Sequence, residues 1–241
     1  MQKCRIAAGG FLLLVLAMFP SQPTAAAPQD EAIPATAGES APEREHVEQP
    51  ELREALLARM AKDQEARKAF LAWDRQNKAA SKAAAERAEE SAPFLEMVKT
   101  DRENREWLKT IVERHGWPGK TLVGTDGAHA AWLLVQHADL DFQRDCLRRM
   151  ERSRPGEVAK VDLAYLTDRV RLAEGKPQVY GTQIEIKDGR WQPRDVEDPD
   201  NLDRRRKEIG LPPIAEYLKQ AEEVYGPPSH APDKPDEKAP R

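Results

Sequence analysis

The densest apolar run of the sequence, Ala130 to Val135, is the feature that most constrains the fold. The helical i, i+3, i+4, i+7 spacing in and beside this run is filled by Ala128, Ala131, Trp132 and Val135. A helix that is apolar on nearly every side has to be buried. We therefore expect the other elements to pack around a helix from about Asp126 to Ala138.

Two polar residues, Gln136 and His137, follow the apolar run directly. Polar groups at the end of a buried helix need hydrogen-bond partners or a hydrated pocket. His137 is therefore the leading candidate for a functional residue.

The spacing of apolar residues elsewhere is also mostly helical. Helices are predicted over 51–91, 101–115, 126–138, 141–153, 162–174, 201–209 and 213–225. Pro93 should end the first of these helices. Asp101 should cap the second, and Gly116 should terminate it.

The period changes from helical to alternating between Thr182 and Lys187. Asp188 and Gly189 then give the signal of a type I′ turn that leads to Trp191. A two-stranded hairpin is marginal alone, so it should pack on helices. The predicted fold class is mainly α, a single helical domain with one small β-hairpin, flanked by disordered segments.

The N-terminal segment has the form of a secretory signal peptide. Lys3 and Arg5 precede an apolar segment from Ile6 to Phe19, and small residues follow at Ala25 to Ala27. This segment is shorter than the roughly 20 residues of a membrane span, although an uncleaved N-terminal anchor is the alternative. We expect an exported protein, periplasmic or extracellular, with no membrane span after signal removal.

Composition sets the predicted domain limits. Both the stretch after the cleavage site and the C-terminal end are rich in Pro and charge and poor in large apolar residues, which is typical of disorder. The predicted organisation is a signal peptide at 1–27, a disordered linker at 28–50, a helical domain at 51–226 and a disordered tail at 227–241.

The charge balance argues against nucleic acid as a partner. The chain has 38 basic and 42 acidic residues, and loss of Lys3 and Arg5 with the signal peptide would change the formal net charge from −4 to about −6. Nucleic-acid binding favours clustered Lys and Arg. The expected partner is instead an unknown small molecule or a component of the cell envelope.

Cysteine and motif content give no sign of a cofactor. Cys146 would stand alone after export, either as a buried inert thiol or as a nucleophile activated by Arg144 and Arg148. The Gly-Lys-Thr at 119–121 fails as a P-loop because Arg114 stands where the first glycine is required. The eight-residue spacing of His129 and His137 sets them about 80° apart around a helix, so we predict no metal and no cofactor.

Candidate site residues are therefore polar groups next to apolar or glycine-rich stretches. The catalytic candidates are His137, Asp126 and Asp168. The candidates for ligand binding are Trp117, Gln136, Arg169, Tyr180 and Gln183. Asp168 and Arg169 could instead form an internal ion pair or hydrogen-bond network.

Several motifs in one order resemble a known family. They are HGWP (115–118), LVG (122–124), AAWLLVQHAD (130–139), LAYLTDRV (163–170), YGTQ (180–183), EDPDN (197–201) and RR…GLPP (205–213). Together they resemble the bacterial domain-of-unknown-function family 6624 over about Leu52 to Tyr225. The chain departs from the family where Phe142 follows Asp141 directly, because members usually carry a Pro and one more residue between them. The resemblance implies no established activity.

Three hypotheses of function follow. The favoured one is a non-catalytic binding or interaction protein of the cell envelope, because no nucleophile, base and orienting residue stand at a recognisable spacing. The alternative is a hydrolase that uses His137 as general base, assisted by Asp126 or Asp168. A purely structural envelope protein, without a concave pocket, is the third.

Overall fold

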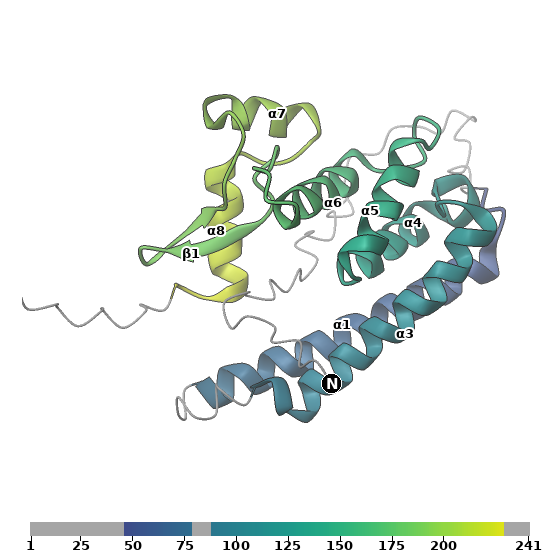
Figure 1. Ribbon diagram of the computed structural model, residues 1–241, viewed down its shortest axis with the longest axis horizontal. Helices are drawn as coiled ribbons and strands as arrows, with labels where there is room; N and C mark the ends of the chain where they lie inside the picture. The colour runs from purple at the N-terminus through teal and green to yellow at the C-terminus, as the bar shows by residue number, and fades with distance from the viewer. Residues whose placement is uncertain (1–45, 79–87, 229–241) are drawn as a thin grey trace, which may run out of the picture. The chain divides into compact units, whose positions relative to one another are not determined.

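The computed structural model describes residues 46–78 and 88–228 (Figure 1). The predicted signal peptide lies outside the described residues, as do the predicted linker up to residue 45 and the predicted tail from residue 229. The described chain is mainly helical with one antiparallel hairpin, as the sequence predicts. Its contacts gather in two compact units that divide at Lys160.

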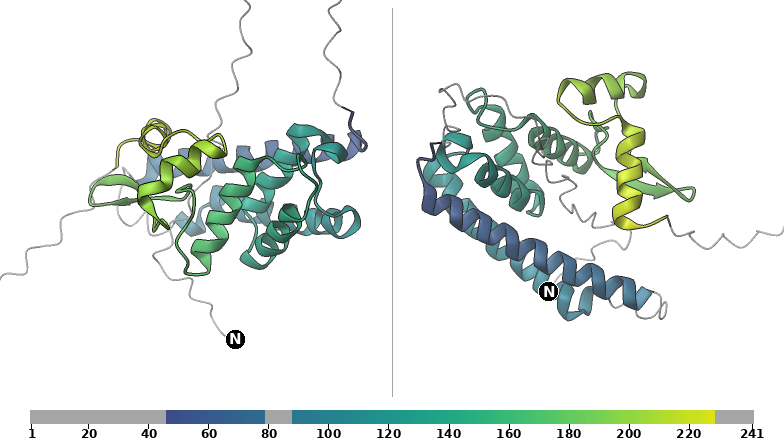
Figure 2. Two further views of the ribbon diagram at one scale, coloured as in Figure 1. Left: turned by 90° about the horizontal axis from the view of Figure 1, so that it is seen from above. Right: turned by 180° about the vertical axis from the view of Figure 1, so that it is seen from behind.

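The first unit, 46–159, is helical. Its elements are α1 (Pro50–Lys78), η1 (Ala88–Glu90), α3 (Ala92–His115), α4 (Lys120–Gln136) and α5 (Leu140–Glu151). Helix α1 packs along α3 and against α4, and α5 packs on α3 and α4 (Figures 1 and 2). The apolar side chains that fill this unit include Leu56, Met97, Leu108, Val112, Trp132 and Leu133.

Helix α4 is the buried helix that the apolar run predicts. All six residues from Ala130 to Val135 are buried. The helix begins six residues earlier than predicted, at Lys120, but Gly124 interrupts its backbone with φ 74° and ψ 169°. Only glycine adopts this region readily, so Gly124 lets the chain turn before the buried run. The part after this break starts close to the predicted Asp126.

The predicted boundary between the first two helices is wrong. Pro93 begins α3 instead of ending its predecessor, and Ser91 is the N-cap, since its hydroxyl accepts a hydrogen bond from the Phe94 N–H. Proline fits the first turn of a helix, where its missing N–H would have no partner. Asp101 consequently lies inside α3, while Gly116 ends α3 with φ 76°, as predicted.

The last residues of the predicted linker are placed in the first unit. The N–H groups of Glu48 and Gln49 donate to the carbonyls of Thr121 and Leu122, at 3.2 and 2.8 Å. Helix α1 then begins at Pro50. These bonds fix the entry of the chain against the first turn of α4.

The second unit, 160–228, combines helices with the hairpin. Its elements are α6 (Lys160–Ala173), β1 (Ile184–Lys187), β2 (Arg190–Pro193), η2 (Pro199–Asn201), α7 (Leu202–Glu208) and α8 (Ile214–Tyr225). Asp188 and Gly189 have φ values of 53° and 68°, as the type I′ turn requires. The hairpin packs on α8 (Figure 1). The Trp191 indole donates to the carbonyl of Gly226, directly after α8, at 3.1 Å.

Within 46–78 and 88–228, no helix combines the length with the hydrophobicity that a membrane crossing requires.

The break in α4 gives a test of the packing. Gly124→Ala should lower the free energy of unfolding by about 1–3 kcal/mol from backbone strain. It should cost about 1 kcal/mol more from crowding, because an added Cβ would lie 3.2 Å from a Val47 methyl carbon. Gly116→Ala is the matched control, since its φ is also positive but nothing lies within 4 Å. Equal losses in urea unfolding would contradict the packing of 46–49 on α4.

Candidate functional site

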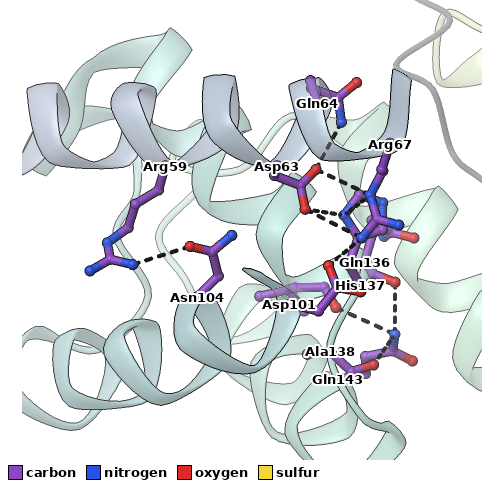
Figure 3. Close-up of polar contacts among 11 residues, drawn as sticks. Arg59, Asp63, Gln64, Arg67, Asp101, Asn104, Gln136, His137, Ala138 and Gln143 are labelled. Atoms are coloured by element: carbon purple, nitrogen blue, oxygen red, sulfur yellow. Dashed lines mark hydrogen bonds and ion pairs between the residues drawn. The ribbon is translucent and has the colours of Figure 1, made fainter. Parts of the chain in front are cut away.

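Four ionisable side chains meet inside the first unit and form what we call the ion cluster: Asp63, Arg67, Asp101 and His137 (Figure 3). Asp63 and Arg67 lie one turn apart on α1, Asp101 lies in the middle of α3, and His137 caps the end of α4. The exposed fractions of their side chains are 1%, 2%, 20% and 6% in the same order. The ion cluster therefore joins three helices away from bulk water.

Arg67 is the hub of the ion cluster. Its Nε lies 3.2 Å from Asp63 Oδ2 and 3.0 Å from His137 Nδ1. Its Nη2 donates to Asp101 Oδ1 and lies 3.3 Å from Asp63 Oδ1. One guanidinium thus faces two carboxyl groups and one imidazole ring.

The contacts of His137 are not all compatible. Its Nδ1 lies 2.9 Å from Asp63 Oδ1, a contact that requires Nδ1 to donate a proton. The same atom lies 3.0 Å from Arg67 Nε, a contact that requires Nδ1 to accept one. A ring nitrogen either carries a hydrogen or offers a lone pair. Whether or not Nδ1 carries a hydrogen, one of its two contacts is therefore unfavourable.

The two carboxyl groups of the ion cluster have opposite pKa shifts. Burial raises the pKa of Asp101 to about 7, and the neighbouring Asp63 adds to this effect against the opposing charge of Arg67. Burial also tends to raise the pKa of Asp63, but its bonds to His137 and Arg67 outweigh burial and lower that pKa to about 2. Asp63 is therefore the permanent anion, and Asp101 exchanges its proton near neutral pH.

Gln143 of α5 holds the backbone beside His137. Its side-chain amide lies 3.3, 3.0 and 3.0 Å from the carbonyls of Val135, Gln136 and Ala138 (Figure 3). The last carbonyls of a helix have no partner within the helix. Gln143 supplies one, and this fixes the position from which His137 projects.

Asp126, predicted as an assistant to His137, does not lie beside it. Its carboxylate forms a two-pronged ion pair with Arg53, at 2.7 and 2.6 Å, on the surface of the unit. Eleven residues of helix separate it from His137, which corresponds to roughly 16 Å along an ideal helix.

Asp168 organises the second unit. Its carboxylate accepts hydrogen bonds from the N–H groups of Val179, Tyr180 and Thr182, at 2.7, 3.1 and 3.0 Å, and from the Thr182 hydroxyl at 3.0 Å. The side chain is fully buried, and burial raises its pKa although these bonds act to lower it. Asp168 therefore lies in an internal hydrogen-bond network, one of the alternatives predicted for it, and this network joins it to the 179–182 backbone.

The predicted ligand-binding residues are divided between the units. Trp117 and Gln136 lie in the first unit, with exposed fractions of 9% and 2%. Arg169, Tyr180 and Gln183 lie in the second unit. Gln183 is engaged locally, because its N–H donates to Gln178 Oε1 and its side-chain amide donates to the Thr182 hydroxyl.

Cys146 is a buried thiol, as the first of its two readings predicts. It is fully buried in α5, and burial raises its pKa to about 12. The neighbouring guanidinium groups of Arg144 and Arg148 bind Asp141 and Asp145. A thiolate nucleophile is therefore not favoured at this position.

A solvent-open cleft of about 450 Å³ lies between α3 and α5, and we call it the α3–α5 cleft. Its lining consists of Arg105, Glu106, Lys109, Val112, Glu113, Asp139, Asp141, Phe142, Asp145 and Arg149. Five of these residues are acidic and three are basic. None of the residues predicted to bind ligand lines it.

Sequence reasoning missed the ion cluster, although a signal for it exists. Asp63 and Arg67 continue the heptad-like spacing of Leu56 and Phe70 on α1. On α3, Asp101 likewise occupies a position of apolar spacing, seven residues before the buried Leu108. A polar residue at an apolar position of a helix marks a buried polar contact.

The ion cluster predicts a pH dependence of stability. Because the pKa of Asp101 is about 7 in the folded protein and near 3.8 otherwise, the folded state holds this proton more tightly. This contribution to stability is full below about pH 4 and is lost as the pH rises through 7. Asp101→Asn keeps the neutral form, so it should be more stable than wild type at pH 8, by up to about 4 kcal/mol.

Urea unfolding at pH 4, 6 and 8 in the presence of a chelator measures this difference. Asp63→Asn is the comparison of opposite sign, because the pKa of about 2 makes the Asp63 anion stabilising above about pH 4. Its removal should destabilise the protein by about 3–5 kcal/mol. A less stable Asp101→Asn variant at pH 8 would show that the Asp101 anion stabilises the cluster.

The Asp168 network gives a second prediction. Asp168→Asn should lower the free energy of unfolding by about 2–4 kcal/mol, because an amide cannot accept all the N–H bonds and leaves buried donors without partners. Asp195→Asn, an exposed position of the same unit, should change stability by less than about 0.5 kcal/mol. Chemical unfolding measures both, and equal effects would rule out a structural role for Asp168.

Comparison with known proteins gives a family but no activity. No curated protein and no solved structure matches the chain. A family model described as a family of unknown function, DUF6624, matches residues 50–228. This match spans both compact units and most of the chain, so the protein belongs to the DUF6624 family.

Proposed function

We propose that the protein is an exported binding or interaction protein of the cell envelope, and that the α3–α5 cleft is its site for a basic peptide segment. The observation that carries this proposal is the excess of five acidic over three basic side chains around an apolar floor. The export part rests on the basic and apolar pattern of residues 1–27.

The floor of the cleft suits the apolar part of a peptide. Val112 and Phe142 line it, and their residues are 1% and 9% exposed. Peptide sites combine an apolar surface with a few polar groups that fix orientation. Here the surrounding charges would supply the orientation.

The basic side chains of the cleft are largely neutralised from within. Arg105 binds Glu106 and Asp139, at 2.7 and 2.9 Å. Arg149 binds Asp145 at 2.8 Å and donates to the Val112 carbonyl at 3.2 Å. These ion pairs engage three of the acidic side chains as well, so what an incoming cation meets is the remaining excess of two negative charges, five acidic minus three basic residues.

Two charged side chains of the cleft remain for a ligand. Within the described part of the chain, Glu113 and Lys109 form no ion pair. Glu113 could bind a Lys or Arg side chain, and Lys109 could bind a carboxylate or carbonyl of the same peptide. Complementary charges of this kind favour encounter and set orientation.

The alternative, a hydrolase with His137 as general base, has less geometric support. A general base needs a hydrogen bond, direct or through one water, to the proton that it removes. Nδ1 of His137 contacts Asp63 and Arg67, and Nε2 is buried. The two other catalytic candidates are engaged elsewhere. Asp126 forms an ion pair with Arg53, and Asp168 accepts hydrogen bonds from backbone N–H groups.

A charge reversal tests the proposed site. Glu113→Lys should weaken binding of a short fluorescent peptide of alternating Lys and Leu by about tenfold, because it replaces attraction with repulsion in the cleft. Fluorescence anisotropy at low and physiological salt measures the affinity. The wild-type protein should also prefer this peptide to one of alternating Glu and Leu.

Glu96→Lys is the matched control, because Glu96 lies on the same helix, is half exposed and does not line the cleft. It changes the net charge equally and should leave the affinity unchanged. Equal losses in the two variants would show general electrostatic attraction. No binding of either peptide to the wild-type protein would refute a basic-peptide site.

A further inference from the structure

The ion cluster brings three potential metal ligands together from three separate helices. Asp63 of α1, Asp101 of α3 and His137 at the end of α4 each offer one donor atom, and these atoms all lie within 4.8 Å of one another (Figure 3). A tetrahedral zinc site places its donors about 3.4 Å apart. Small side-chain rotations would therefore close the three atoms around one ion.

The hydrogen-bond pattern supplies an independent reason to expect a cation. His137 Nδ1 cannot donate to Asp63 and accept from Arg67 at the same time. A metal ion removes this conflict, because the Nδ1 lone pair and Asp63 Oδ1 would both bind the ion. Arg67 could then donate to carboxylate oxygens that do not bind it.

The charge of the cluster also favours a divalent ion. The carboxyl groups of Asp63 and Asp101 both face the guanidinium of Arg67 at close range. A divalent cation would neutralise the two carboxylates, although Arg67 competes with it for them. Arg67 therefore weakens metal binding, and its removal should strengthen it.

We propose that Asp63, Asp101 and His137 bind one Zn²⁺ ion, in competition with the Arg67 guanidinium. Imidazole and carboxylate ligands together suit zinc, whereas calcium and magnesium prefer oxygen ligands alone. Three protein ligands leave a position for water, on the side of Asp101, whose side chain is the most exposed of the three. The site is separate from the α3–α5 cleft and does not depend on the proposed function.

Isothermal titration of the chelator-treated wild-type protein with zinc chloride tests the inference. One ion should bind per chain, raise the melting temperature and be preferred to Ca²⁺ by at least about 100-fold. Asp101→Asn and His137→Gln should each weaken Zn²⁺ binding by at least about tenfold. Arg67→Gln should strengthen it by at least about tenfold.

His115→Gln is the matched control, because His115 is an exposed histidine outside the ion cluster. It should bind Zn²⁺ as tightly as the wild type, and a loss of affinity there would instead indicate adventitious binding at the surface. The inference is overturned if the wild type binds no Zn²⁺, even if Arg67→Gln does, because Arg67 would then be the permanent counterion.

A measurement on the wild-type protein alone tests the site even if some of the variants fail to fold. Anomalous scattering at the zinc absorption edge, from crystals grown with Zn²⁺, should place one peak between the carboxyl groups of Asp63 and Asp101 and the His137 ring. A peak only at other residues would contradict the site.

Discussion

The contact on which most of the first unit depends is that between Arg67 and its three neighbours. A buried guanidinium without partners is very costly, and so are the buried carboxyl groups around it. Arg67 and Asp63 belong to the same turn of α1, so the positions of α3 and α4 are set by where Asp101 and His137 reach them. The apolar contacts of Leu56, Leu108 and Trp132 drive collapse, and the ion cluster restricts which arrangement of the helices satisfies every charge.

The apolar pattern predicted the α4 helix because a six-residue apolar run permits few alternatives to burial. The hairpin was equally well specified, since Asp188 and Gly189 both have the positive φ that its turn requires. The prediction at Pro93 was wrong because proline is found both after helices and in their first turn. Which of the two applies depends on whether a cap such as Ser91 precedes it. The break at Gly124 could not be predicted, because glycine permits this backbone conformation without requiring it. The residues that an added Cβ would meet there, Val47 and Arg53, are far away in the sequence.

The candidate site shows the same division. His137 could be singled out because a polar residue directly follows the buried run. Its actual partners come from α1 and α3, and pairwise proximity between helices cannot be read from one sequence. Asp168 was selected for the right reason, a carboxyl group on an apolar helix, but the donors that its carboxylate binds are backbone N–H groups of the 179–182 segment. Both cases show that a buried charge can be located from sequence before its partner can.

The hydrogen bonds of Gln143 couple the local stability of α4 to that of α5. Because one amide serves the carbonyls of Val135, Gln136 and Ala138, α5 cannot open at its start without also removing the cap of α4. Local opening in proteins proceeds in cooperative groups that share hydrogen bonds. The end of α4 and the first turn of α5 therefore form one cooperative unit. Fraying of α5 at its start is opposed by the free energy that keeps the buried helix α4 closed.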